Sequence, residues 1–163
     1  MFTAEYWADK LNLAPHPEGG YYRETYRSAS IIPSGVLGEE YSESRCTSTA
    51  IYFLLGQGDK SKFHRLKSDE AWIYNSGGSA EIFMLGKHGL KIEKIGPDIN
   101  NGESFQVFIP KNVWFAAKVT RGDYLLITCT VAPGFEFNDF ELAESQKLVN
   151  DFPDYRQIIN ELT

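Results

Sequence analysis

Short apolar or alternating segments, separated by turn formers, follow one another along most of the chain. Segments this rich in β-branched and aromatic residues predict strands, and about nine are expected. Among the separators, Ser76-Gly77-Gly78 and Arg121-Gly122 each predict a tight antiparallel reversal. The expected strands cover residues 21–27, 45–55, 62–66, 71–74, 80–85, 90–95, 105–109, 113–119 and 124–131.

Helical patterns are confined to the two ends of the chain. Thr3 is placed to cap a short helix that stops before Pro15. Residues 141–150 and 153–162 predict two further short helices, and Pro153 suits the first turn of the second. Residues 28–44, rich in Ser, Gly and Glu, predict a long exposed loop. This order favours an all-β jelly roll or barrel, because it lacks the long crossovers that a parallel sheet needs.

Length and charge narrow the class of protein. The 163 residues suit one domain, taken as residues 1–163. A net charge of −6 without a Lys/Arg cluster argues against a nucleic-acid partner. The first twelve residues carry acidic side chains and the longest apolar run is Ala50–Leu55, so we expect neither a signal peptide nor a membrane anchor. In the cytoplasmic protein that this indicates, Cys46 and Cys129 are expected to be buried free thiols.

A constellation of Gly, His and Glu stands in the middle of the strand series. The chain has Gly58-x5-His64-x-Leu66-x3-Glu70-x6-Gly77 and later Pro110-x-Asn112-x2-Phe115. This spacing resembles the two motifs of the cupin superfamily, G-x5-H-x-H-x3/4-E-x6-G and G-x5-P-x-G-x2-H. The resemblance implies a cupin double-stranded β-helix, or jelly-roll barrel, with a short N-terminal helix and short C-terminal helices.

Three segments make the resemblance more specific. They are similar to the cupin-5 group, small single-domain RmlC-like cupins of unknown function, and the similarity implies a homodimer. The segments are His16-Pro-Glu-Gly-Gly-Tyr-Tyr-Arg-Glu, Phe63-His-Arg-Leu-Lys-Ser-Asp-Glu-Ala-Trp and Val131-Ala-Pro-Gly-Phe-Glu-Phe-Asn-Asp-Phe.

The metal set of a typical cupin is incomplete. Such a centre uses two His and a Glu from the first motif and a third His from the second. Leu66 and Phe115 stand where two of these histidines would be. We therefore expect no metal and no other cofactor. Were a metal bound, His64, Glu70 and Gln106 would be its ligands.

His64 and Glu70 are the leading candidates for a site. A His and a Glu form a costly polar pair to bury in an apolar barrel, which favours a function for them. Such a pair can act as acid and base or hold a polar ligand. Tyr74, on the same strand face as Glu70, is expected as a further catalytic acid.

Further residues are expected to contact a ligand. Gln106 offers an amide in an apolar strand, Trp72 shares the face of Glu70, and Phe115 narrows the pocket. Tyr22 and Arg23 are expected at the mouth of a pocket. The resemblance implies that this is the pocket of a neighbouring subunit, although a solvated strand edge explains the two residues nearly as well. Two alternatives stay open for Glu136, Asn138 and Asp139: they surround the pocket entrance, or they belong to a segment that closes the end of the barrel. His88 is expected to be a turn residue without a role in the site.

Three functions stay open. The first is a metal-free homodimer that binds, isomerises or epimerises a small polar metabolite such as a carbohydrate or sugar nucleotide, with His64 moving a proton. The second is a metal-dependent dioxygenase or isomerase that uses His64 and Glu70 with unusual additional ligands. The third is a ligand-binding module without catalysis.

Overall fold

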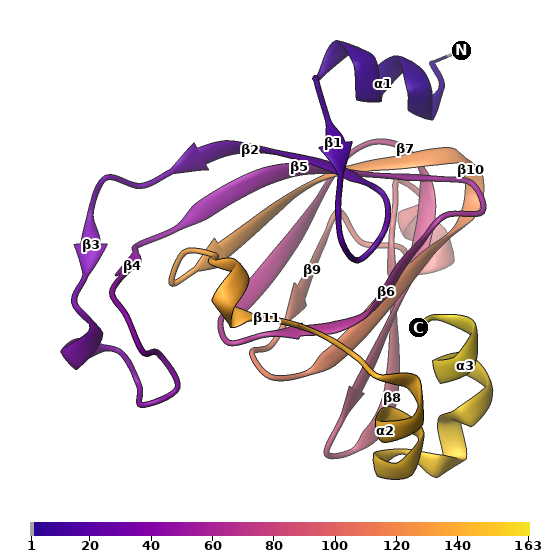
Figure 1. Ribbon diagram of the computed structural model, residues 1–163. Helices are drawn as coiled ribbons and strands as arrows, with labels where there is room; N and C mark the ends of the chain where they lie inside the picture. The colour runs from indigo at the N-terminus through magenta and orange to yellow at the C-terminus, as the bar shows by residue number, and fades with distance from the viewer. Residues whose placement is uncertain (1) are drawn as a thin grey trace.

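Two long, bent strands form the frame of a β-barrel in the computed structural model, which describes residues 2–163 (Figure 1). Strand β7 (Asp69–Gly86) pairs with β10 (Trp114–Ala132) along almost its whole length. On its other side, β10 pairs first with β6 (Lys60–Leu66) and then with β5 (Thr49–Gly56). All these pairings are antiparallel, so the predicted all-β fold with short helices at both ends is confirmed.

The other elements complete the barrel and flank it. The strands are β1 (Ala14–Pro15), β2 (Tyr21–Arg27), β3 (Ile31–Ile32), β4 (Arg45–Cys46), β8 (Gly89–Ile95), β9 (Gln106–Ile109) and β11 (Phe140–Leu142). The helices are α1 (Ala4–Lys10), α2 (Ser145–Asp151) and α3 (Arg156–Glu161), with 3-10 turns at Ser34–Val36, Ile99–Asn101, Phe137–Asp139 and Pro153–Tyr155. No helix within residues 2–163 is long and apolar enough to cross a membrane.

Glycines bend β7 and β10 where the two backbones touch. The turns predicted at Ser76-Gly77-Gly78 and Arg121-Gly122 are wrong, because both stretches lie inside the long strands at register shifts of their ladder. Gly77 has φ 101° and Gly122 has φ 85°. A Cβ on Gly78 would lie 1.6 Å from the carbonyl oxygen of Arg121. Glycine here permits a close approach rather than a reversal, so four predicted strands merge into two.

Strand pairing also shifts the remaining boundaries. The strand predicted over 45–55 is divided, because Arg45–Cys46 pair with β3 while the ladder of β5 begins at Thr49. Residues 141 and 142 were expected to be helical but extend β11, which pairs with β6, and α2 begins only at Ser145. In each case backbone pairing with a distant segment outweighs local propensity.

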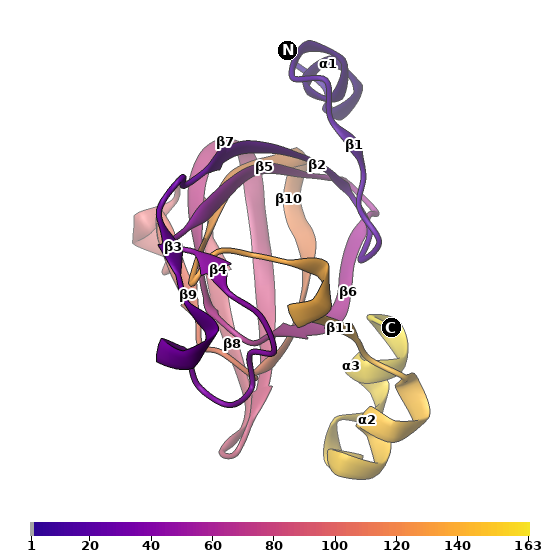
Figure 2. The same ribbon diagram turned by 60° about the vertical axis from the view of Figure 1, so that its left-hand side comes forward.

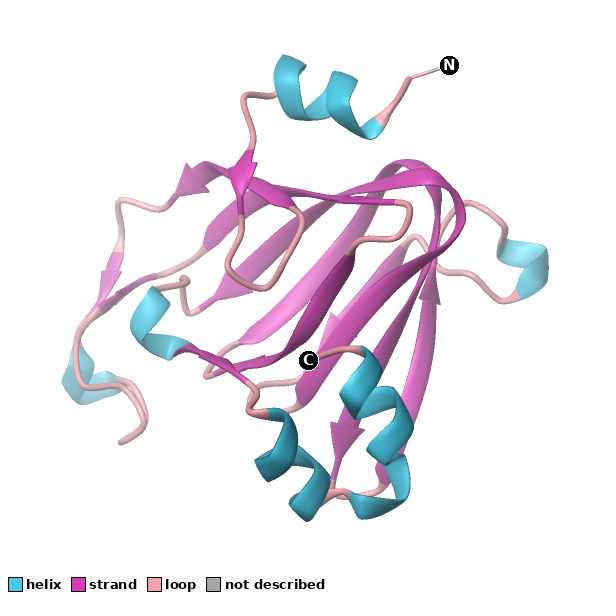
Figure 3. Cartoon of the chain, turned by 45° about the vertical axis from the view of Figure 1, so that its right-hand side comes forward, coloured by secondary structure: helices cyan, strands magenta, loops and turns pink. Residues whose placement is uncertain are grey.

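Helices cover the outside of the barrel in two places (Figures 2 and 3). Helix α1, capped by Thr3 Oγ1 accepting the N–H of Tyr6 at 3.2 Å, packs Trp7 against Leu54 and Leu126. Helices α2 and α3 bury Leu148 and Ile159 against the outer side of β6 and β7. The interior holds a separate apolar core of strand residues that includes Phe53, Ile82 and Ile127. Cys46 and Cys129 are buried free thiols, as predicted.

A buried ion pair fixes the segment of residues 133–140 to the rest of the protein. Arg45 donates through Nε and a terminal nitrogen to the two carboxylate oxygens of Asp139, at 2.6 and 2.7 Å. Both side chains are at most 3% exposed. The second terminal nitrogen of Arg45 donates to the carbonyls of Glu43 and Ser44. The ion pair therefore ties the segment that follows β10 to strand β4.

This ion pair predicts a strong dependence of stability on Asp139. In Asp139→Asn the guanidinium of Arg45 stays buried without its counter-ion, so we expect the free energy of unfolding to fall by about 3–5 kcal/mol. Urea denaturation at pH 7 measures this loss. Glu141→Gln is the matched control, because it removes the exposed pair with Arg65 and is expected to cost less than about 1 kcal/mol. Similar losses in the two variants would contradict the structural role of the buried pair.

Candidate functional site

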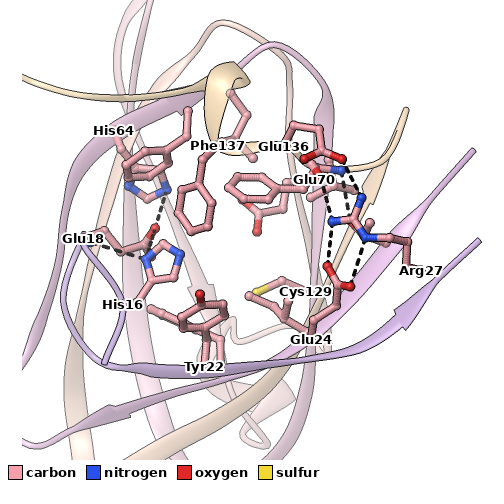
Figure 4. Close-up of a pocket in the computed structure, with 17 residues that line it drawn as sticks. His16, Glu18, Tyr22, Glu24, Arg27, His64, Glu70, Cys129, Glu136 and Phe137 are labelled. Carbon is pink, nitrogen blue, oxygen red and sulfur yellow. Dashed lines mark hydrogen bonds and ion pairs between the residues drawn. The ribbon is translucent and has the colours of Figure 1, made fainter. Parts of the chain in front are cut away.

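A cavity of about 150 Å³ lies inside the barrel, between strands β2, β5, β6 and β10 and the segment of residues 133–140 (Figure 4). Its walls are mostly aromatic and aliphatic side chains. The ionisable acid, base and thiol groups that reach it form three sets: His16, Glu18 and His64; Glu70 and Cys129; and Glu24, Arg27 and Glu136. The hydroxyl-bearing residues Tyr22 and Thr49 also line it.

A tight turn that contains Gly19 and Gly20 places the side chain of Glu18 in the cavity wall. The main chain of His16 exchanges hydrogen bonds with the turn that follows, since its N–H donates to Gly20 and its carbonyl accepts from Gly19. Gly19 has φ 112°, and a Cβ there would lie 2.1 Å from the carbonyl oxygen of Lys60. Glycine thus lets the turn lie directly on β6, where the Glu18 carbonyl accepts the N–H of Lys62.

The carboxyl of Glu18 lies between two imidazole rings. Its Oε2 is 3.2 Å from Nε2 of His64 and 3.3 Å from Nδ1 of His16. Its Oε1 accepts a hydrogen bond from the buried hydroxyl of Ser61 at 2.8 Å. The side chains of His16, Glu18 and His64 are each at most 8% exposed.

The hydrogen-bond partners assign the ring protons. Nδ1 of His64 lies 2.7 Å from the carbonyl oxygen of Lys62, which can only accept, so Nδ1 carries the proton of the neutral ring. Nδ1 of His16 accepts the main-chain N–H of Glu18 at 3.3 Å. Both nitrogens that face Oε2 are therefore acceptors in neutral rings, and a proton on Oε2 can be donated to either of them, one at a time.

Burial favours the uncharged form of each of these three groups. It raises the pKa of Glu18 well above its usual range, and the nearby carboxyl of Glu70 raises it further. Burial lowers the pKa of His64 to about 3 and that of His16 to about 4. Burial therefore favours a protonated carboxyl between two neutral imidazoles.

Glu70 is a second buried carboxyl, 7% exposed, near the start of β7. Burial raises its pKa to about 7, against the opposing influence of Cys129 and Trp72. Burial also raises the pKa of the Cys129 thiol, so this group is a neutral S–H beside Glu70. Among residues 2–163, Glu70 takes part in no ion pair. The buried indole N–H of Trp72 also lacks a partner in hydrogen-bond geometry.

Charged groups at the cavity mouth are bound to one another. Arg27 donates to both carboxylate oxygens of Glu24, at 3.0 and 2.8 Å, and to Glu136 at 2.6 Å. Their side chains are 39–45% exposed, so the pairs add little to stability. Two carboxylates around one guanidinium nevertheless leave this mouth with a net negative charge.

The structure brings some predicted site residues to the cavity and leaves others away from it. His64, Glu70 and Tyr22 line it. Phe115 is buried behind His64, with ring centroids 4.0 Å apart, and Trp72 is buried in the barrel core beside Phe53 and Phe115.

The other three predicted residues do not line the cavity. Tyr74 shares the inward face of β7 with Glu70, but each pair of residues advances the strand by nearly 7 Å. Its hydroxyl therefore donates to Gly77 elsewhere in the barrel. Gln106 is exposed on β9, and Arg23 lies over the outer ring of Tyr52, because strand alternation turns both outward.

Sequence reasoning missed His16, Glu18 and Cys129 as site residues. The first two belong to the His16-Pro-Glu-Gly-Gly segment, whose adjacent glycines were the available signal. Of the residues considered for the pocket entrance, Glu136 lines the mouth, Asn138 is exposed and Asp139 forms the buried pair with Arg45.

The residues present do not fit a typical cupin metal centre. Leu66 and Phe115 are buried apolar side chains at two of the four ligand positions. Both nitrogens of His64 are engaged, by Lys62 and by Glu18. Within residues 2–163 no three His, Cys, Asp or Glu side chains are arranged to hold a metal ion.

Comparisons with known proteins place the chain among uncharacterised relatives. Residues 5–143 match the family model Cupin_5, described as Cupin superfamily (DUF985). An uncharacterized protein of Saccharomyces cerevisiae, YML079W, is 31% identical over 78% of this chain and 68% of its own length.

Solved structures show the same fold. A hypothetical protein from Leishmania major has a TM-score of 0.91 and 32% identity, with 99% of each chain covered. Protein SO0799 from Shewanella oneidensis has a TM-score of 0.87 and 35% identity, over 100% of this chain and 98% of its own. Oxalate decarboxylase from Bacillus subtilis shares the fold alone, with a TM-score of 0.55 and 15% identity over 91% of this chain and 36% of that chain.

The assigned protonation of Glu18 predicts a mild effect of Glu18→Gln. The amide can donate N–H to His64 and accept from Ser61, as the neutral acid does, so the free energy of unfolding at pH 7 is expected to change by less than about 1 kcal/mol. Glu18→Ala, which leaves Ser61 and His64 without a partner, is expected to cost about 2–3 kcal/mol. Denaturation curves give both values. An equal, large loss in the two variants would show that the native group is a charged carboxylate.

The raised pKa of Glu70 predicts a stability that falls as pH rises. Between its ordinary value of 4.5 and about 7 the folded protein holds a proton that the unfolded chain has lost. This contribution is therefore complete below 4.5 and is lost as the pH passes 7, by about 3 kcal/mol in total. Glu70→Gln removes it. We expect the unfolding free energy of the native protein minus that of this variant, both measured by urea denaturation, to fall by most of this amount from pH 5 to pH 8.

Proposed function

The chain belongs to the Cupin_5 family of the cupin superfamily (DUF985), and on this premise we propose that its cavity moves a proton on a small, non-anionic carbonyl compound, as an isomerase or epimerase does. One observation carries the proposal. The carboxyl of Glu18 lies within 3.3 Å of two imidazole nitrogens, buried at the wall of the cavity. A proton held in this way can move without a large change in charge at any one group.

Cavity size and charge restrict the substrate. A volume near 150 Å³ accepts a molecule about as large as benzene. This supports a small carbonyl compound or the smallest carbohydrates rather than a whole sugar nucleotide. The acidic mouth also repels phosphate and carboxylate groups.

Glu70 is the proposed base. Its pKa of about 7 lies near neutral pH, where a carboxyl combines a useful ionised fraction with a strong affinity for protons. As a carboxylate it takes the proton from the carbon next to the carbonyl group. The electron pair of that C–H bond moves toward the carbonyl oxygen.

His16 is the proposed acid at that oxygen. Since its Nδ1 faces Glu18, the ring proton is on Nε2. No residue within the described part of the chain accepts a hydrogen bond from this Nε2–H group. Nε2 gives this proton to the carbonyl oxygen while Glu18 passes its own proton to Nδ1. A neutral imidazole opposite a carboxylate base suits enolisation, because it polarises the carbonyl group. In a hydroxycarbonyl compound this gives an enediol. Glu70 then returns its proton to the former carbonyl carbon, while His16 Nε2 takes the proton of the neighbouring hydroxyl oxygen and Nδ1 returns its proton to Glu18, which completes an isomerisation.

His64 acts in this proposal as a positioning residue. Its Nδ1 is fixed by the carbonyl of Lys62, so its Nε2 holds the Glu18 carboxyl in line with His16. The role proposed from the sequence for Tyr74 is not retained, because its hydroxyl is engaged by Gly77 away from the cavity. The homodimer and the cytoplasmic location stay predictions. Exposed Phe108 on strand β9, and exposed Phe105 directly before that strand, support the homodimer.

Hydrogen–deuterium exchange tests the proposed reaction. In D₂O, ¹H NMR follows the C–H signals of a panel of small neutral hydroxyketones such as 3-hydroxybutan-2-one. We expect the protein to accelerate exchange, and Glu70→Gln and His16→Gln each to slow it by about 100-fold or more. His88→Gln, in an exposed turn, is the matched histidine control and is expected to leave the rate unchanged.

Two outcomes would count against the reaction. Binding of panel members without any acceleration would indicate a ligand-binding module. Exchange that persists in both variants would place the chemistry elsewhere in the molecule.

A further inference from the structure

We infer that the ligand of this cavity is a small organic cation, with its ammonium group between the phenyl rings of residues 135–140 and the carboxyl of Glu70. The inference rests on the proposed function only in placing the ligand in the same cavity. It names a substrate class that neither the fold nor the relatives specify.

Three phenyl rings form a corner of the cavity wall. Phe135 and Phe137 have centroids 5.0 Å apart at 80°, and Phe137 and Phe140 have centroids 6.2 Å apart at 79°. Phe135 and Phe140 close the set at 6.4 Å and 67°. The faces of aromatic rings are negative and attract cations, and rings in several orientations around one point are the arrangement that recognises ammonium groups.

The charges that face the cavity favour a cation as well. Arg27 is its one cationic side chain among the described residues, and Glu24 and Glu136 both bind it. His16 and His64 are neutral, and the thiol of Cys129 is uncharged. The remaining ionisable carboxyls, Glu18 and Glu70, can only add negative charge. An anionic ligand would therefore meet no free positive partner, whereas a cation would lower the repulsion between carboxylates.

Glu70 supplies the specific contact. This carboxyl is 93% buried and lines the cavity, but within residues 2–163 no cation pairs with it. A buried carboxylate without a cationic partner is costly, so an ammonium group that reaches it gains electrostatic attraction, and an ammonium group with N–H donors also gains a hydrogen bond. Figure 4 shows Glu70 and Phe137 pointing into the same space. The bound cation would also favour the ionised form of Glu70, which is the form that acts as a base.

The test compares ligands of one shape and different charge. Choline, 3,3-dimethylbutan-1-ol and 3,3-dimethylbutanoate differ mainly in carrying a positive, no or a negative charge. Calorimetric titration of the whole protein at pH 8 gives the three affinities. We expect choline to bind at least about tenfold more tightly than the alcohol, and the carboxylate to bind most weakly.

Two variants locate the effect. Glu70→Gln is expected to reduce the preference for choline by about tenfold while leaving the affinity for the alcohol within about threefold. Retained alcohol binding also shows that this variant is folded. Glu93→Gln, on the outer strand β8, is expected to keep the full preference.

The outcomes separate the inference from the proposed function. Equal or tighter binding of the alcohol would overturn the cationic class, while the exchange experiment could still support proton transfer. A preference for choline that survives Glu70→Gln would overturn the assigned contact. Failure of all three ligands to bind would overturn the inference.

Discussion

The close approach of β7 and β10 is the constraint on which the barrel depends. At Gly78 the strands come so near that a single added carbon would overlap the carbonyl of Arg121. The bend made there lets each strand serve both ends of the barrel within one continuous ladder. It also sets the register that places Glu70 opposite Val131 and Trp72 opposite Cys129. The position of the buried carboxyl in the cavity is therefore fixed by backbone geometry some distance away from it.

The cavity resolves the cost of burying ionisable groups by keeping them uncharged. Glu18 holds a proton that its two imidazole neighbours can accept, and Cys129 stays a thiol. Charges appear only at the mouth, where water still reaches Arg27 and its two carboxylates. Glu70 is the exception, since its pKa near 7 leaves it divided between two states at neutral pH. Burial thus brings the pKa of this carboxyl into the range where it can both gain and lose a proton near neutral pH.

The sequence predicted the class of fold well, because alternation and aromatic content report on pleated, half-buried strands. The prediction failed at glycines, which occur both in turns and at bends within strands: Gly77, Gly78 and Gly122 predicted turns but allow bends inside β7 and β10. For the site, the spacing around His64 and Glu70 pointed to residues that do line the cavity. Period-two alternation gave the face of Tyr74 correctly but not its distance along the barrel. The partnership of Glu18 with His64 is set by the turn that lies on β6, a contact between segments more than 40 residues apart that no local pattern encodes.

The cavity is assembled from parts of the chain that are far apart. Its lining comes from the His16 turn, from β2, β5, β6 and β10, from the start of β7, and from the segment that Arg45 holds through Asp139. None of these parts forms the site by itself, so a ligand recognises only the closed barrel. Occupancy of the cavity and folding of the chain are then linked equilibria, and free ligand at 100 times its dissociation constant would add about 2.7 kcal/mol to global stability. A ligand bound in the cavity would in this way lower the fraction of molecules that are globally unfolded.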